Sequence, residues 1–248
     1  MDLHVSAVQG IPDVERGDDV AALIGDAVAR EGRRVESGDV FVIAQKVISK
    51  AEGAIVWLDD VAPSRMATQW AADHGRDARV VEVILRESRR IVRMDQGILI
   101  TETHHGFVCA NAGVDASNVP PGFVTVLPRD PDASAEGLRV ALSATFGRPI
   151  AIIVSDTFGR PWREGVVNVA LGVAGLRPLM DLRGTVDAYG RPLVSTLVAV
   201  ADELAGAAEL VTRKSANTPV AIVRGAGDWI GEGAGRMLVR ESSRDLFR

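Results

Sequence analysis

The run Pro149-Ile150-Ala151-Ile152-Ile153-Val154-Ser155 carries the strongest fold signal in this chain of 248 residues. A continuous apolar segment of this length is typical of a strand that is buried on both faces. The run Asp39-Val40-Phe41-Val42-Ile43-Ala44 is a second compact strand, because its β-branched residues favour extended structure. Buried strands of this kind fit an α and β architecture in which helices flank the sheet.

Weaker signals outline the remaining elements. Apolar runs predict strands at Leu3–Val8, Ile98–Thr101, Gly106–Ala110, Val166–Val173 and Pro219–Val223. Helical spacing predicts helices from a cap at Asp18 or Asp19 to about Gly32, around Pro63–His74, from a cap at Ser134 to about Phe146, and over Val200–Val211. A weak boundary near residues 120–134 divides the single domain 1–248 into two lobes. No repeat or low-complexity tract is present.

Composition narrows the function. The chain is 47% apolar and 25% charged, which is enough apolar material for a core, and its net charge of −5 gives no overall attraction to nucleic acid. The single cysteine, Cys109, allows no intramolecular disulfide and favours the cytoplasm. We expect Cys109 to be a buried small hydrophobe rather than a nucleophile. The first residues lack a basic region followed by an apolar stretch, and no apolar run approaches the ~18–20 residues that cross a bilayer, so we expect neither secretion nor a membrane span.

The first candidate site follows the buried strand, which we expect to end at Asp156. Asp156 and Thr157 offer the hard oxygen ligands that Mg²⁺ or Mn²⁺ takes. Arg160 and Arg163 come shortly after them, and guanidinium groups fit phosphate oxygens. The alternative is that Asp156 caps a turn and that both arginines are solvated.

A second acidic loop, residues 111–118, follows another strand. Its Asp115 would share a metal ion with Asp156, because Mg²⁺ is usually held by one or two carboxylates together with substrate phosphates. A local Asx-turn is the alternative.

Two lysines follow the strand 39–44 directly. A helical turn or a strand would each place Lys46 and Lys50 on a shared side, where they form a positive pocket for polyphosphate oxygens. Solvated lysines are the alternative. The run 213–217 either clamps a nucleotide or ends a helix with cations that complement its dipole. The sequence contains no Rossmann, P-loop, α/β-hydrolase or zinc-protease motif, so any nucleotide is held differently.

Several blocks of this sequence resemble the coenzyme F420-0:L-glutamate ligase family, the F420 gamma-glutamyl ligases. The blocks follow the order of the family and cover almost the whole chain. They are Gly10–Pro12, Ser49–Gly53, Gly106–Asp115 with Asn118, Ser155–Gly165, Ala201–Leu204 and Val220–Gly225. The resemblance implies an α+β fold with mixed β-sheets, flanking helices and two lobes, different from the standard Rossmann and P-loop folds, in a chain that forms a homodimer.

The resemblance also implies the ligands. It suggests GTP as co-substrate, two Mg²⁺ or Mn²⁺ ions per site, and K⁺. By position, Asp115 and Asp156 resemble ligands of one divalent ion, and Thr157 resembles a ligand of the second. The residues that resemble GTP contacts are Ile11, Pro12, Asp13, Val14, Gln45, Lys50 and Asn118, together with the loop 212–219. In that loop this sequence departs from a Met-Gly-Glu run found in some members: it has Lys214, which cannot ligate Mg²⁺.

The expected reaction is the GTP-dependent formation of an amide between a carboxylate of coenzyme F420-0 and L-glutamate, through an acyl phosphate, with possible further γ-linked additions. Lys50, Arg160 and Arg163 would neutralise phosphate charge. A ligase of another carboxylate and a non-catalytic GTP-binding module remain alternatives. Family members also occur fused to a C-terminal nitroreductase-like domain, so this chain is expected to be either a whole protein or an N-terminal part.

Overall fold

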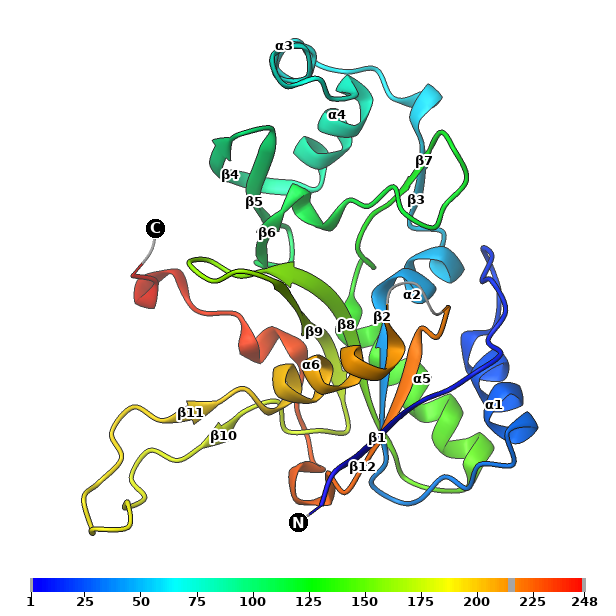
Figure 1. Cartoon of the computed structure of the whole chain (residues 1–248), viewed down its shortest axis with the longest axis vertical. Helices are drawn as coiled ribbons and strands as arrows, with labels where there is room; N and C mark the ends of the chain where they lie inside the picture. Colours follow the sequence, from blue (N-terminus) through cyan, green and yellow to red (C-terminus); the bar gives the residue numbers. More distant parts are fainter. Residues whose placement is uncertain (1, 214–216, 247–248) are drawn as a thin grey trace.

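The chain forms two lobes (Figure 1). The computed structural model describes residues 2–213 and 217–246. The larger lobe is built on a five-stranded sheet, and the smaller lobe is formed by the residues between strands β3 (Ile55–Trp57) and β7 (Phe123–Thr125). The predicted boundary at residues 120–134 covers the segment in which the chain returns to the larger lobe.

The five strands of the large sheet run in the order β1 (His4–Ala7), β12 (Val220–Arg224), β2 (Val40–Ala44), β8 (Ala151–Gly159) and β9 (Val166–Ala174). The β2–β8 pair is parallel, with Val42 opposite Ile153, and the other three pairs are antiparallel. This mixed sheet differs from the mostly parallel sheet of a Rossmann fold. It confirms the predicted α+β class.

Helices cover both faces of the large sheet. Because side chains of a strand alternate between its faces, Phe41 and Ile152 pack with α1 (Val20–Arg30), α2 (Gln45–Glu52) and α5 (Pro131–Phe146). Val42 and Ile153 pack with α6 (Val200–Thr212), which crosses the opposite face in Figure 1. All four side chains are almost completely buried, so the predicted burial of these strands on both faces is confirmed.

The smaller lobe has its own core. Its three-stranded antiparallel sheet has the order β4 (Ser88–Asp95), β5 (Ile98–Thr103) and β6 (Val108–Ala110), and helices α3 (Arg65–His74) and α4 (Ala78–Arg86) pack on it around Leu99. Strands β3 and β7 pair beside this unit. In the part of the chain that the structure describes, the short 3₁₀ helices are η1 (Leu58–Asp60), η2 (Asn111–Gly113), η3 (Gly227–Trp229), η4 (Gly235–Leu238) and η5 (Ser242–Arg244).

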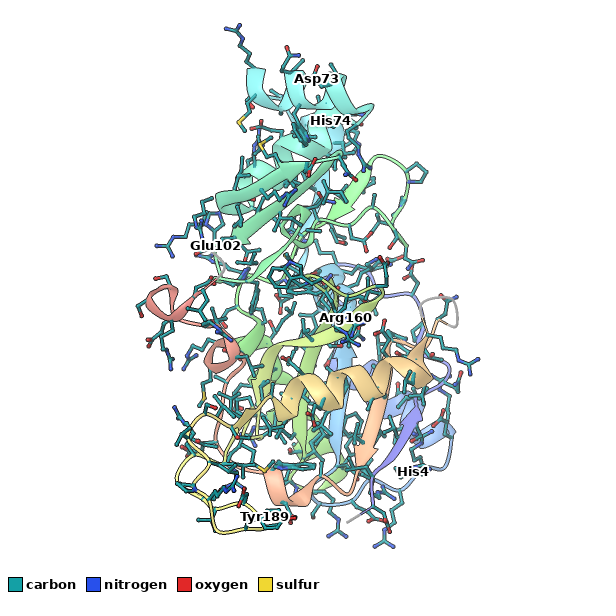
Figure 2. All side chains as sticks on the ribbon, turned by 60° about the vertical axis from the view of Figure 1, so that its left-hand side comes forward. His4, Asp73, His74, Glu102, Arg160 and Tyr189 are labelled. Carbon is teal, nitrogen blue, oxygen red and sulfur yellow. The ribbon has the colours of Figure 1, made fainter. Side chains whose placement is uncertain are left out.

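A long hairpin leaves the larger lobe between β9 and α6. It contains the short strands β10 (Met180–Asp181) and β11 (Leu197–Val198), and its exposed Tyr189 lies far from the smaller lobe (Figure 2). Among the described residues, no helix is both long enough and apolar enough to span a membrane.

Two predicted boundaries are wrong. Strand β8 does not end at Asp156 but continues to Gly159, because residues 156–159 pair with residues 166–169 of β9. Helix α5 is capped by Asp130 rather than by Ser134: the Asp130 carboxylate accepts the Ala133 N–H at 3.0 Å. Proline fits the first turn of a helix, so Pro131 supports this earlier start. The Asp19 cap of α1 is confirmed.

Candidate functional site

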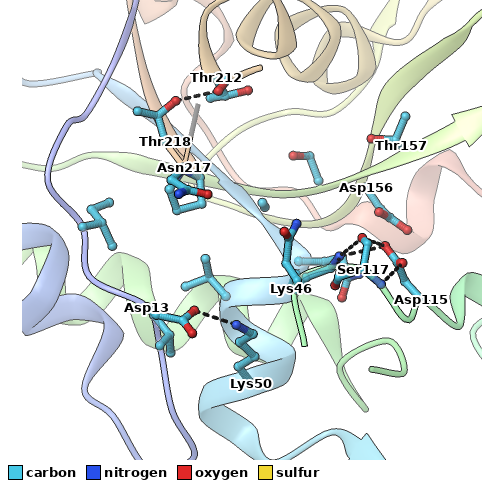
Figure 3. Close-up of a pocket in the computed structure, with 18 of the residues that line it drawn as sticks. Asp13, Lys46, Lys50, Asp115, Ser117, Asp156, Thr157, Thr212, Asn217 and Thr218 are labelled. Carbon is cyan, nitrogen blue, oxygen red and sulfur yellow. Dashed lines mark hydrogen bonds and ion pairs between the residues drawn. The ribbon is translucent and has the colours of Figure 1, made fainter. Parts of the chain in front are cut away.

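A cavity of about 620 Å³ lies where the two lobes meet, and Figure 3 shows much of its wall. Its walls come from segments that are far apart in the sequence. They are residues 11–14, 44–47 and 50, then 115 and 117–120 from the smaller lobe, then 155–157 and 168, and finally 209, 212–213 and 217–219. Every residue that resembles a metal ligand or a GTP contact of the family lines this cavity, apart from the part of the loop 212–219 that lies outside the described residues.

The backbone of Asp115 pairs with Thr125 at the edge of the smaller lobe. The two residues exchange two hydrogen bonds, at 3.0 and 2.8 Å. The Asp115 carboxylate accepts the Ser117 N–H at 2.7 Å, which is the Asx-turn considered as an alternative. The turn and a ligand role are compatible, because a carboxylate has about four lone-pair sites.

The charge of Asp115 is balanced by its neighbours. Burial raises the pKa of this carboxyl, but hydrogen bonds from Lys46 and Ser117 outweigh burial, and the net pKa is lowered from 3.8. Lys46 forms an ion pair with Asp115 at 2.7 Å. Asp115 is therefore an anion at neutral pH.

Asp156 and Thr157 reach the cavity from β8. The pairing of β8 with β9 shifts register between Val154 and Ser155, directly before these two residues. The Thr157 hydroxyl donates to the Asn168 side-chain oxygen at 2.7 Å, across the β8–β9 pair. In Figure 3 the carboxylates of Asp115 and Asp156 point toward the same part of the cavity.

This donor set fits a hard divalent cation. Asp115, Asp156 and Thr157 supply oxygen, the donor atom that Mg²⁺ and Mn²⁺ prefer. Within residues 2–213 and 217–246, no three His, Cys, Asp or Glu side chains gather at one point that would hold a metal. Such a cation would therefore take its remaining ligands from water or from substrate, as Mg²⁺ usually does.

Two lysines of the cavity wall, Lys46 and Lys50, belong to α2. Lys50, buried and one turn after Lys46, forms an ion pair with Asp13 at 2.6 Å. Gln45 is also buried, and its side-chain oxygen accepts from Ser49 at 2.7 Å. Because α2 begins directly after β2, the end of this strand positions both lysines.

The other predicted GTP contacts lie on two loops. In the first loop Ile11 and Val14 are buried in the core, while Pro12 and Asp13 are exposed. Asn118 is exposed in the second loop and has a φ of 56°. The structure brings these residues to the cavity; their contact with GTP stays a prediction.

The two arginines lie elsewhere. Arg160 and Arg163 are exposed in the turn between β8 and β9, and neither lines the cavity. The Arg160 guanidinium donates to the backbone carbonyl of Glu164 within the same turn. Figure 2 shows Arg160 near the junction of the lobes. Their predicted role toward phosphate has no support from this arrangement and stays a prediction.

The loop after α6 also reaches the cavity, through Thr212, Arg213 and residues 217–219. Lys214, the position at which the sequence departs from the family pattern, lies outside the described residues together with residues 215 and 216.

Ser117, Asn168 and Glu209 are polar cavity residues that the sequence analysis did not name as ligand contacts. Ser117 follows Asp115 at the spacing of an Asx-turn, so local sequence gave a usable signal. Asn168 enters the site only because β9 places it opposite Thr157, and Glu209 accepts the Asn168 N–H at 2.9 Å from α6. No local pattern reports such a pairing.

Cys109, His104 and His105 lie outside the cavity wall. Cys109 is buried, as predicted, and burial raises its pKa to about 12. A ring nitrogen of His104 lies 2.9 Å from the Arg86 carbonyl oxygen, and one of His105 lies 2.9 Å from that of Pro128.

Fold and cavity together define a class: a two-lobed α+β protein with a ligand cavity that pairs acidic oxygen donors with lysines. The family follows from comparison with known proteins. The chain belongs to the F420-0:gamma-glutamyl ligase family, whose model matches residues 10–225, and is therefore a ligase.

Curated relatives match this chain over most or all of their length. The chain is 47% identical to the coenzyme F420:L-glutamate ligase of Methanothermobacter thermautotrophicus, with 100% of both chains covered. It is 50% identical to the enzyme of the same name from Methanopyrus kandleri, covering 95% of this chain and 93% of the relative. For the Archaeoglobus fulgidus enzyme of that name the identity is 40%, over 100% and 97% of the two chains.

Proposed function

We propose that this chain joins L-glutamate to coenzyme F420-0 through an amide bond and uses GTP and divalent cations to do so. The family and the names of its relatives support the two substrates. The observation that carries the use of a nucleotide is the cavity itself. Its wall places Asp115 and Asp156 together and Lys50 on a neighbouring helix, a distribution of charge that suits a metal-bound triphosphate.

The proposed reaction has two steps. A carboxylate is a poor acylating agent, so an oxygen of the F420-0 carboxylate attacks the γ-phosphorus of GTP, the bond to the β-phosphate oxygen breaks, and GDP leaves. The amine nitrogen of glutamate then attacks the carbonyl carbon of this acyl phosphate. Inorganic phosphate leaves, and the amine loses a proton. The same steps would add further glutamates through γ-linkages.

The residues of the chain act by position and charge. Asp115, Asp156 and Thr157 would hold divalent cations, which when bound neutralise charge on the phosphates. Lys50 would bind phosphate oxygens, and residues 11–14, Gln45 and Asn118 would orient the nucleotide. K⁺ as an additional ion and a homodimer belong to the same proposal, since both are implied by the family resemblance.

Mass spectrometry tests this proposal. The chain is incubated with F420-0, glutamate, GTP and Mn²⁺, and we expect products that differ by one glutamate residue, with GDP and phosphate released in equal amounts. Matched reactions replace GTP by ATP or F420-0 by another carboxylate. Product only with the other carboxylate would favour the other-carboxylate ligase, product only with ATP would exclude GTP as the co-substrate, and GTP binding with no product would favour the non-catalytic module.

A further inference from the structure

The Lys46 ammonium donates three hydrogen bonds to the loop that carries Asp115. It lies 2.7 Å from an Asp115 carboxylate oxygen, 2.8 Å from the Ser117 carbonyl oxygen and 2.7 Å from the Ser117 hydroxyl. An ammonium has three hydrogens, so these three acceptors use its full capacity. The Lys46 side chain is 18% exposed, which strengthens the ion pair relative to one on the open surface.

This arrangement sets two cations against each other. The carboxylate oxygen that Lys46 contacts, Oδ2, also accepts the Ser117 hydroxyl at 2.9 Å, and the other oxygen, Oδ1, accepts the Ser117 N–H at 2.7 Å. A divalent cation that binds Asp115 would therefore lie beside the Lys46 ammonium and be repelled by it. The Lys46 ammonium and a divalent cation therefore compete for the Asp115 carboxylate.

We propose that Lys46 is an exchangeable counter-ion of Asp115: it competes with the divalent cation, and the phosphates of the nucleotide release Asp115 by drawing Lys46 away. The inference rests on the proposed function. It predicts that cation and nucleotide bind cooperatively, and thermodynamic linkage requires that each improves the affinity of the other by the same factor.

The geometry allows the exchange. Lys46 has a flexible four-carbon stem and lines the same cavity as the predicted nucleotide contacts, so its ammonium can turn from Asp115 toward phosphates bound there. Figure 3 shows the lysine directed to Ser117 and Asp115, while Lys50 is directed to Asp13. Asp13 is 85% exposed and is no predicted metal ligand. Lys50 is thus a matched control: same helix, same charge, same cavity, different carboxylate.

The test measures each ligand alone. Mn²⁺ binding without nucleotide is followed by the electron paramagnetic resonance of free Mn²⁺, and binding of a non-hydrolysable GTP analogue in EDTA is followed by calorimetry. For Lys46→Met we expect Mn²⁺ to bind about tenfold more tightly and the analogue about tenfold more weakly. For Lys50→Met we expect the analogue alone to weaken, with Mn²⁺ affinity within about threefold of wild type.

The opposite signs separate this role from loop positioning, which would weaken Mn²⁺ binding in Lys46→Met. Unchanged or weaker Mn²⁺ binding there, or equal tightening in Lys50→Met, would overturn the inference. Lys46→Gln, neutral but still a hydrogen-bond donor, replaces Lys46→Met if circular dichroism shows that variant to be unfolded. If wild type forms glutamylated product but Lys46→Met does not bind Mn²⁺ more tightly, the inference alone is refuted. If Lys46→Met binds Mn²⁺ more tightly but wild type forms no product, the ligase proposal alone is refuted.

Discussion

Asp115 and Asp156 approach one cavity from the two lobes, and the proposed chemistry depends on both. Replacing Asp156 with Asn keeps its size but removes the negative charge that a divalent cation needs. We expect Asp156→Asn to lower the rate of glutamate addition by at least about 100-fold, with the far-ultraviolet circular dichroism unchanged. Asp26→Asn, on the exposed side of α1, is the control and keeps full activity. If Asp156→Asn kept the wild-type rate, this carboxylate would have no part in the reaction.

Cys109 gives a second prediction at this scale. Burial, and then the charge of Asp156, raise the pKa of its thiol to about 12, so the reactive thiolate is scarce at pH 8. We expect iodoacetamide at pH 8 to leave folded protein unmodified by mass spectrometry and to label the chain in guanidinium chloride. Fast alkylation of the folded protein would show that this thiol is accessible.

At the scale of elements, Gly172 lies where the first residue of α5 packs tightly against β9. A Cβ at this position of β9 would overlap the carbonyl oxygen of Pro131. We expect Gly172→Ala to lower the free energy of unfolding by roughly 1–3 kcal/mol in urea titrations, because backbone must shift to admit the methyl group. The control is Gly137→Ala on the exposed side of α5, where a Cβ meets no neighbour. Helix propensity predicts a gain of about 0.5–1 kcal/mol there; equal effects in both variants would contradict this packing.

The cap of α4 gives a pH-dependent prediction. The hydrogen bond with the Arg79 side chain holds the pKa of the Asp77 carboxyl below 3.8. A carboxyl with a depressed pKa stabilises the fold fully above its unfolded pKa and loses this contribution as the pH falls through the folded value. Asp77→Asn keeps a capping oxygen without the charge. It should therefore be less stable than wild type at pH 7, and the difference should shrink as the pH falls below 3.8.

Solvent screening limits the size of that effect. The Asp77 side chain is 38% exposed, so we expect a difference of less than about 1 kcal/mol at pH 7. Urea titrations of both proteins at pH 7 and pH 3 measure it, and Asp73→Asn, an exposed position of α3, is the control. A difference that grows toward pH 3 would have the wrong sign.

Element prediction succeeded where burial leaves a pattern in the sequence. The apolar run of β8 and the helical spacing of α6 gave these elements within a few residues. Residues 156–159 could not be predicted as part of β8, because the apolar run ends before them. Only their pairing with β9, which the sequence does not reveal, makes them a strand. Asp130 was overlooked as a cap since Ser134, also a capping residue type, follows it within the same first turn.

At the scale of the whole molecule, the site is a property of the arrangement of the lobes. Sequence identified Asp115, Asp156 and Lys50 as chemically suited residues, but their meeting depends on the smaller lobe placing the loop 115–120 beside α2 and β8. No local pattern encodes that. Glu209 and Asn168 were missed for the same reason, because each lines the cavity only through the docking of α6 and β9.

Crystals grown with Mn²⁺ and a non-hydrolysable GTP analogue test the central claim most directly. Anomalous diffraction at the manganese edge should show a peak between the carboxylates of Asp115 and Asp156, with the phosphates of the analogue beside it. A manganese peak elsewhere, or a nucleotide bound in the cavity with no cation between these carboxylates, would contradict the account.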